Sequence, residues 1–90
     1  MAERRVIHFQ GRVQGVGFRY TAARLAERFT VGGSVQNLPD GRVLLVAEGE
    51  PKELDRFVAA IEAEMGRYIT QKNVETAPAS GETEGFEIRY

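Results

Sequence analysis

The sequence GRVQGVGFR (residues 11–19) places three glycines between two segments of different pattern. Before it, Val6–Gln10 alternates apolar and polar side chains, which is typical of a β-strand. After it, residues 18–29 carry apolar side chains at helical spacing. Because glycine adopts positive φ and allows close approach of the backbone, the stretch predicts a tight loop between a strand and a helix.

This loop and the start of the helix have features that favour the binding of an anion. Backbone N–H groups in a glycine-rich turn can point to one centre, and a helix amino terminus adds unpaired donors and about half a positive charge. Arg19 stands where the loop enters the helix, so its guanidinium could bind two phosphate oxygens at once. The spacing G-x-x-x-G-x-G fits neither the dinucleotide-binding fingerprint nor the Walker loop. On these residues alone, an anion site and a plain tight turn are both open.

A β-hairpin is predicted after the first helix. The segment 31–38 alternates in polarity, the turn Leu38-Pro39-Asp40-Gly41 has the residues that β-turns favour, and Arg42–Ala47 runs back as a strand. This returning strand is apolar on both faces, which indicates a central position in a sheet.

The rest of the chain predicts one more helix and two more strands. The helix begins at Pro51 and ends at Gly66. The strand over residues 68–76 has apolar residues out of phase, which indicates an edge strand or a bulge, and a short strand starts at Phe86. The order β-α-β-β-α-β with a terminal strand predicts an α+β fold: a two-layer, ferredoxin-like sandwich with two helices on one face of a mainly antiparallel sheet. We expect residues 1–90 to form a single domain.

Composition narrows the classes of function. The net charge is −1 with scattered Lys and Arg, so the basic face of a nucleic-acid binder is missing. The absence of cysteine excludes disulfides, thiolate zinc sites and a thiol nucleophile, and it fits a reducing compartment. The acidic residues lack metal-ligand spacing, and no segment approaches membrane-spanning length. We expect a cytoplasmic protein without a metal site that binds neither nucleic acid nor membranes.

Asn37 is the other polar residue that the predicted topology brings towards the loop. In a split βαβ unit the first strand and the returning hairpin strand are neighbours, so residues 36–38 come back to the loop side. Asn37 therefore faces the anion site or acts as a local cap beside the turn, and the residues alone leave both roles open.

Two segments resemble the signatures of the acylphosphatase family: VQGVGFR (residues 13–19), preceded by Gly11-Arg12, and GSVQNLPDGRV (residues 33–43), which runs on to Gly49. The resemblance covers essentially the whole chain. It implies hydrolysis of acyl phosphates to a carboxylate and inorganic phosphate, without metal or cofactor.

The resemblance also implies roles for individual residues. Arg19 is implied to bind the phosphate beside the loop amides, and Asn37 to orient the attacking water. The implied phosphate-binding loop consists of Gln14, Gly15, Val16, Gly17, Phe18 and Arg19. We expect a monomer that binds a small-molecule acyl phosphate, with inorganic phosphate as product and competitive ligand.

Two other classes of function match parts of the sequence. A catalytically inactive anion-binding or regulatory module would keep the loop without positioning water, and the presence of Asn37 argues against it. An RNA-recognition module has the same βαββαβ order, and residues 17–20 superficially resemble its aromatic motif. These residues, however, lie between a strand and a helix, and not on a central strand where bases could stack.

Overall fold

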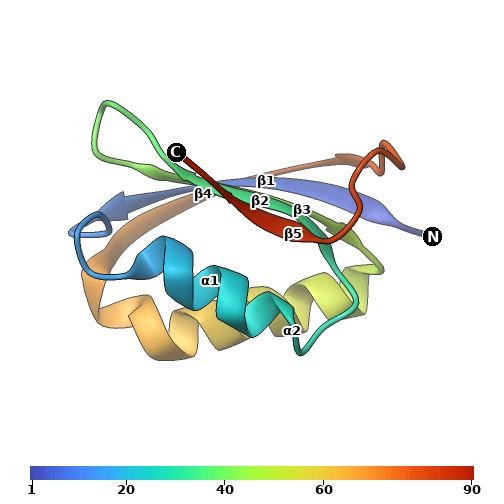
Figure 1. Cartoon of the computed structure of the whole chain (residues 1–90), viewed down its shortest axis with the longest axis horizontal. Coiled ribbons are helices and arrows are strands. Elements are labelled where there is room, and N and C mark those ends of the chain that lie inside the picture. Colours follow the sequence, from blue (N-terminus) through green and yellow to red (C-terminus); the bar gives the residue numbers. More distant parts are fainter.

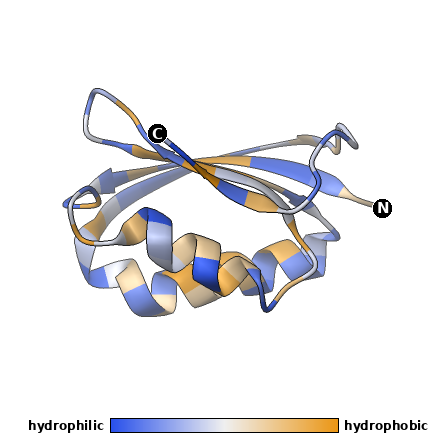
Figure 2. Ribbon diagram, viewed as in Figure 1, coloured by the Kyte–Doolittle hydropathy of each residue, from blue (hydrophilic) through white to orange (hydrophobic).

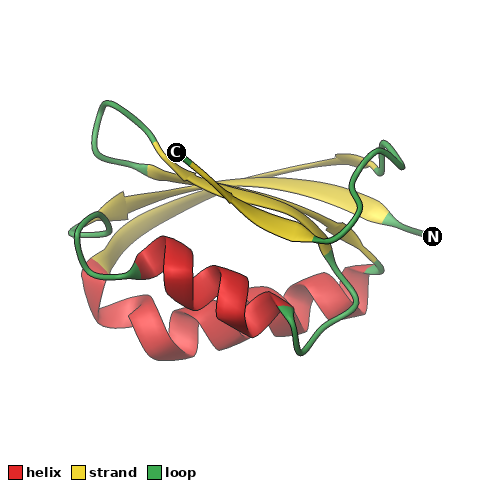
Figure 3. Ribbon diagram, viewed as in Figure 1, coloured by secondary structure: helices red, strands yellow, loops and turns green.

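The computed structural model describes residues 1–90, and it places two helices on one face of a five-stranded sheet (Figures 1 and 3). The helices are α1 (Phe18–Ala26) and α2 (Pro51–Met65), and the short 3-10 helix η1 (Gly66–Tyr68) connects α2 to the sheet. The strands are β1 (Glu3–Gly11), β2 (Gly32–Asn37), β3 (Val43–Gly49), β4 (Ile69–Pro78) and β5 (Phe86–Arg89). The predicted ferredoxin-like α+β sandwich is confirmed.

The order of the strands is β4-β1-β3-β2-β5, so β3 occupies the centre of the sheet, as its apolar sequence predicted. All neighbouring strands are antiparallel except the pair β2 and β5, which is parallel. Strand β4 lies at an edge, and its register with β1 shifts between Gln10 and Gly11. Both features that its irregular pattern suggested, an edge position and a bulge, are therefore present.

The hydrophobic core fills the space between the sheet and the helices, and Figure 2 shows that both layers contribute apolar residues. Phe9 near the end of β1 and Phe18 at the start of α1 are both buried, and their ring centroids lie 5.0 Å apart. Replacing such a buried ring with alanine typically costs about 3–5 kcal/mol of stability. The contact fixes the two ends of the loop formed by residues 12–17.

Helix α1 is shorter than its apolar spacing predicted, because it ends at Ala26 and not at residue 29. The next three N–H groups bond three residues back, and Phe29 N donates to the carbonyl of Ala26 at 3.1 Å. Phe29 still packs on Phe57, with ring centroids 5.9 Å apart. The apolar pattern therefore continued through a tight turn that is no longer α-helical.

Several strands also differ from their predicted bounds. Strand β1 begins at Glu3, three residues before the apolar pattern, because residues 3–5 pair with β3 on one edge and with β4 on the other. Strand β4 begins at Ile69, since Tyr68 belongs to η1, and it continues to Pro78. No helix in the structure has the length and apolar character needed to cross a membrane.

Glu48 at the end of β3 anchors the connection between β4 and β5. Its side chain is only 6% exposed, and its carboxylate accepts hydrogen bonds from Ser80 N at 2.9 Å, Ser80 Oγ at 2.7 Å and Gly81 N at 3.2 Å. Thr83 Oγ1 and the Arg4 guanidinium donate two more. These hydrogen bonds lower the pKa of Glu48 from 4.5 to about 2, and the bond from Ser80 N has the largest effect.

The free energy of unfolding should therefore depend on pH through Glu48. Because the folded-state pKa lies below the unfolded value, the carboxylate stabilises the fold fully above about pH 4.5, and this contribution is lost as pH falls towards 2. Urea unfolding of the wild type and of Glu48→Gln should give a difference at pH 7 that shrinks between pH 4.5 and 2.5. Glu87→Gln, at an exposed site on β5, is the control. A Glu48→Gln difference that stays constant over this range would contradict the assignment.

Candidate active site

The loop of residues 12–17 leaves its backbone donors free. Gly15 and Gly17 both have φ of +79°, and a Cβ at either position would meet nothing within 4 Å, so backbone conformation and not crowding calls for glycine. None of the N–H groups of residues 12–17 donates to another backbone group. The loop therefore presents several unpaired donors at the end of β1.

Helix α1 begins directly after this loop and adds to its positive potential. Its first backbone hydrogen bond runs from Thr21 N to the carbonyl of Gly17 at 2.9 Å. The amino-terminal cap, Gly17, has no side chain to satisfy the preceding donors, and the first turn contains no acidic residue. Such a helix end favours an anion through its free N–H groups and its dipole.

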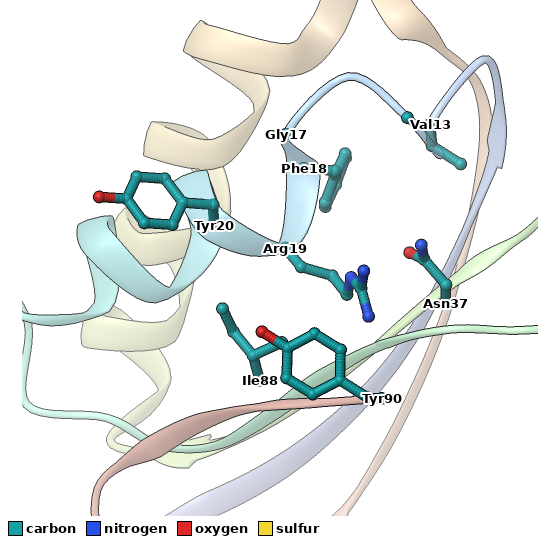
Figure 4. Close-up of a pocket in the computed structure, with 9 residues that line it drawn as sticks. Val13, Gly17, Phe18, Arg19, Tyr20, Asn37, Ile88 and Tyr90 are labelled. Carbon is teal, nitrogen blue, oxygen red and sulfur yellow. The ribbon is translucent and has the colours of Figure 1, made fainter.

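A pocket of approximately 180 Å³ opens where the loop meets α1 (Figure 4). Its lining comes from the loop, the start of α1, the end of β2 and the carboxyl-terminal strand: Val13, Gly15, Gly17, Phe18, Arg19, Tyr20, Asn37, Ile88 and Tyr90. Arg19 and Asn37, which are 18 positions apart in sequence, meet here. Arg19 is the only charged side chain in the lining, which contains no Asp, Glu, His or Lys.

Contacts with the end of the chain orient the Arg19 side chain. Its Nη1 donates to the carbonyl of Arg89 at 3.2 Å, and its guanidinium carbon lies 4.8 Å from the centroid of the Tyr90 ring. Figure 4 shows the guanidinium next to this ring and on the side of the pocket that faces Asn37. Tyr90 is 94% exposed and the hydrogen bond is also exposed, so the two contacts favour this conformation of the side chain without locking it.

Asn37 is the last residue of β2 and lies opposite Val43 in β3. Backbone bonds close the adjacent turn, from Leu38 N to the carbonyl of Arg42 at 2.8 Å and from Gly41 N to that of Leu38 at 3.1 Å. The Asn37 side chain does not cap this turn. Its Oδ1 is buried and accepts no hydrogen bond from the protein, and Asn37 is one of the residues that line the pocket.

Two residues of the implied loop direct their side chains elsewhere. Gln14 bonds to the β2–β3 turn, and Val16 packs against the hydrophobic core. The pocket also contains residues that the sequence did not indicate, chiefly Ile88 and Tyr90. The alternating pattern of the last strand did not indicate that this strand ends at the site, because nothing in the pattern relates Tyr90 to Arg19, which lies far earlier in the sequence. Tyr20 touches the rim, but its ring points away from Arg19 (Figure 4).

The fold and the pocket together define a ferredoxin-like α+β protein with a cavity at the amino end of its first helix. The model of the acylphosphatase family matches residues 5–88, and the chain belongs to this family. An acylphosphatase from Archaeoglobus fulgidus is 44% identical over 85 residues, which cover 93% of this chain and 94% of the relative. One from Rubrobacter xylanophilus is 45% identical over 84 residues, which cover 92% of this chain and 76% of the relative. The crystal structure of acylphosphatase from Bacillus subtilis superposes with a TM-score of 0.85 at 35% identity, with full coverage of both chains.

Proposed function

We propose that this protein hydrolyses the carboxyl–phosphate bond of acyl phosphates, with Arg19 and the loop amides holding the phosphoryl group and Asn37 orienting the attacking water. Acylphosphatase activity follows from membership of the family, and the roles of the individual residues are our proposal. The observation that carries it is the pocket itself: its one charged side chain, the glycine loop with unpaired N–H donors and an unpaired buried amide oxygen lie together.

The phosphoryl group of the substrate is a dianion, and the pocket offers matching donors. N–H groups of the loop and of the first turn of α1 donate to no other backbone group, so they are free to bind its oxygens. The planar Arg19 guanidinium binds two oxygens and neutralises charge that develops in the transition state. The contacts with Arg89 and Tyr90 favour this orientation before binding, which lowers the conformational entropy that binding costs.

The reaction needs a positioned water more than a strong base. The water oxygen forms a bond to phosphorus while the bond from phosphorus to the bridging carboxyl oxygen breaks, and its electron pair leaves with the carboxylate. Asn37 Oδ1 accepts a hydrogen bond from the water and so directs its lone pair at phosphorus. A neutral amide cannot remove the proton, and the lining has no Asp, Glu, His or Lys side chain that could serve as a base. A phosphate oxygen of the substrate therefore takes it.

Phosphate release from benzoyl phosphate tests the proposal. We expect turnover without added metal, competitive inhibition by inorganic phosphate and no loss of rate in the presence of EDTA. Binding of phosphate in a calorimeter without hydrolysis of benzoyl phosphate would instead indicate an inactive anion-binding module. A pH–rate profile that required an enzyme group to be deprotonated near pH 7 would contradict transfer of the proton to the substrate.

A further inference from the structure

We propose that Gln14 is a positioning residue that sets the place of Asn37 relative to the phosphate-binding loop. The inference rests on the proposed function, because it assigns Asn37 the role of orienting water. Gln14 belongs to the loop, but it is absent from the lining of the pocket. Its side chain turns towards the β2–β3 turn, which directly follows Asn37.

The contact is made by a single side-chain nitrogen with two acceptors. Gln14 Nε2 donates to the carbonyl of Leu38 at 2.8 Å and to the carbonyl of Arg42 at 2.9 Å. Both hydrogens of the amide are thus used, and the amide oxygen could not replace the nitrogen because carbonyl groups only accept. No other hydrogen bond joins residues 12–17 to residues 38–42.

The two ends of this contact adjoin the pocket. Gly15, the next residue after Gln14, lines the pocket from the loop, and Asn37, the residue before Leu38, lines it from β2. The carbonyl of Arg42 also accepts Leu38 N at 2.8 Å, so the same acceptor closes the turn and receives Gln14. The Gln14 side chain therefore fixes the distance between the group that binds phosphate and the group that orients water.

Loss of this link should affect turnover more than phosphate binding. Arg19 and the loop amides belong to one continuous segment that enters α1, so they keep their mutual arrangement when Gln14 is replaced. Asn37 lies on a separate hairpin and would shift relative to them. An error of about 1 Å in the position of a reacting group can reduce the rate by roughly 100-fold. We therefore expect a smaller displacement of Asn37 to reduce kcat on the order of tenfold.

The first test is Gln14→Met, which keeps the length of the side chain and removes the donor. We expect kcat for benzoyl phosphate to fall by about tenfold, while the inhibition constant of inorganic phosphate changes by less than about threefold. Gln71→Met is the matched control, because Gln71 is exposed on β4 and its side chain makes no hydrogen bond. Its kinetics should equal those of the wild type. Equal kcat for Gln14→Met and the wild type would overturn the proposal.

A double-mutant cycle separates positioning from a general loss of structure. If Gln14 acts through Asn37, then Gln14→Met should change kcat by less than about twofold in a chain that already carries Asn37→Ala. An equal fall in both backgrounds would show that Gln14 does not act through Asn37. This outcome differs from failure of the proposed function, in which Asn37→Ala alone would leave turnover unchanged.

A shorter polar residue provides a second variant in case the methionine variant does not fold. Gln14→Asn retains an amide but lacks one methylene, so its nitrogen cannot reach both carbonyls from the same backbone position. We expect the same split, with kcat reduced and phosphate inhibition retained. A Gln14→Asn enzyme with wild-type kcat, or one that loses phosphate binding as strongly as turnover, would contradict the role.

Discussion

Replacement of Arg19 by alanine should reduce phosphate binding and turnover together. Arg19 supplies the only charged side chain in the pocket, so no other side chain there can neutralise the phosphoryl dianion. Removal of one preorganised donor from such a site commonly lowers kcat by about 100- to 1,000-fold, and we expect a loss of this size for benzoyl phosphate. The inhibition constant of inorganic phosphate should rise in parallel, because the same guanidinium binds substrate and product.

Two further variants test whether the planar guanidinium of Arg19, and not positive charge in general, is responsible for phosphate binding and turnover. Arg19→Lys keeps the charge but cannot bind two oxygens in a plane, so its activity should lie between that of the wild type and of the alanine variant. Arg24→Ala removes a guanidinium from the same helix, where it pairs with Glu64 at 2.8 Å away from the pocket. Its kinetics should be unchanged. Wild-type phosphate inhibition in Arg19→Ala would exclude Arg19 as the phosphate ligand.

Replacement of Asn37 by alanine should lower turnover and leave phosphate affinity almost intact. Its buried Oδ1 has no donor in the protein, so removal of the amide breaks no internal hydrogen bond. Water that is no longer directed at phosphorus attacks less often, and the expected fall in kcat is on the order of 100-fold. Steady-state kinetics with benzoyl phosphate, together with phosphate inhibition, separate the two quantities.

Thermal unfolding and a matched asparagine complete this test. Asn37→Ala should unfold close to the wild-type temperature, since truncation of an unpaired polar group costs little. Asn73→Ala, on the exposed edge strand β4, should match the wild type in both kinetics and unfolding. If Asn37→Ala weakened phosphate binding as much as turnover, Asn37 would be a phosphate ligand and not a residue that orients water.

Local patterns predicted the fold because each element carries its own signal. The spacing of Phe18, Ala22 and Leu25 marks the buried side of α1, and all three are buried in the structure. The apolar strand that follows Arg42 lies in the centre of the sheet, as expected of a strand with apolar residues on both faces. Arg19 and Asn37 could be brought together from sequence because the split βαβ order returns the hairpin to the loop.

Contacts between distant segments account for what the sequence did not reveal. Gln14 binds backbone carbonyls, which every residue has, so the sequence contains no signature of its partners. Glu48 is anchored by the loop at Ser80, more than 30 residues away, and alternation in β3 alone did not indicate a buried carboxylate. Helix α1 was predicted too long because Phe29 keeps its spacing and its burial after the helical hydrogen bonds end.

The opposite placement of the two chain ends matters for protein engineering. Met1 is fully exposed, and the amino terminus lies at the far end of the sheet from the loop and the start of α1 (Figure 1). The exposed ring of Tyr90, by contrast, has its centroid 4.8 Å from the guanidinium carbon of Arg19. An affinity tag or fusion partner attached before Met1 therefore leaves the entrance of the pocket clear. Any extension after Tyr90 starts beside the guanidinium, so immobilisation or reporter fusions should use the amino terminus.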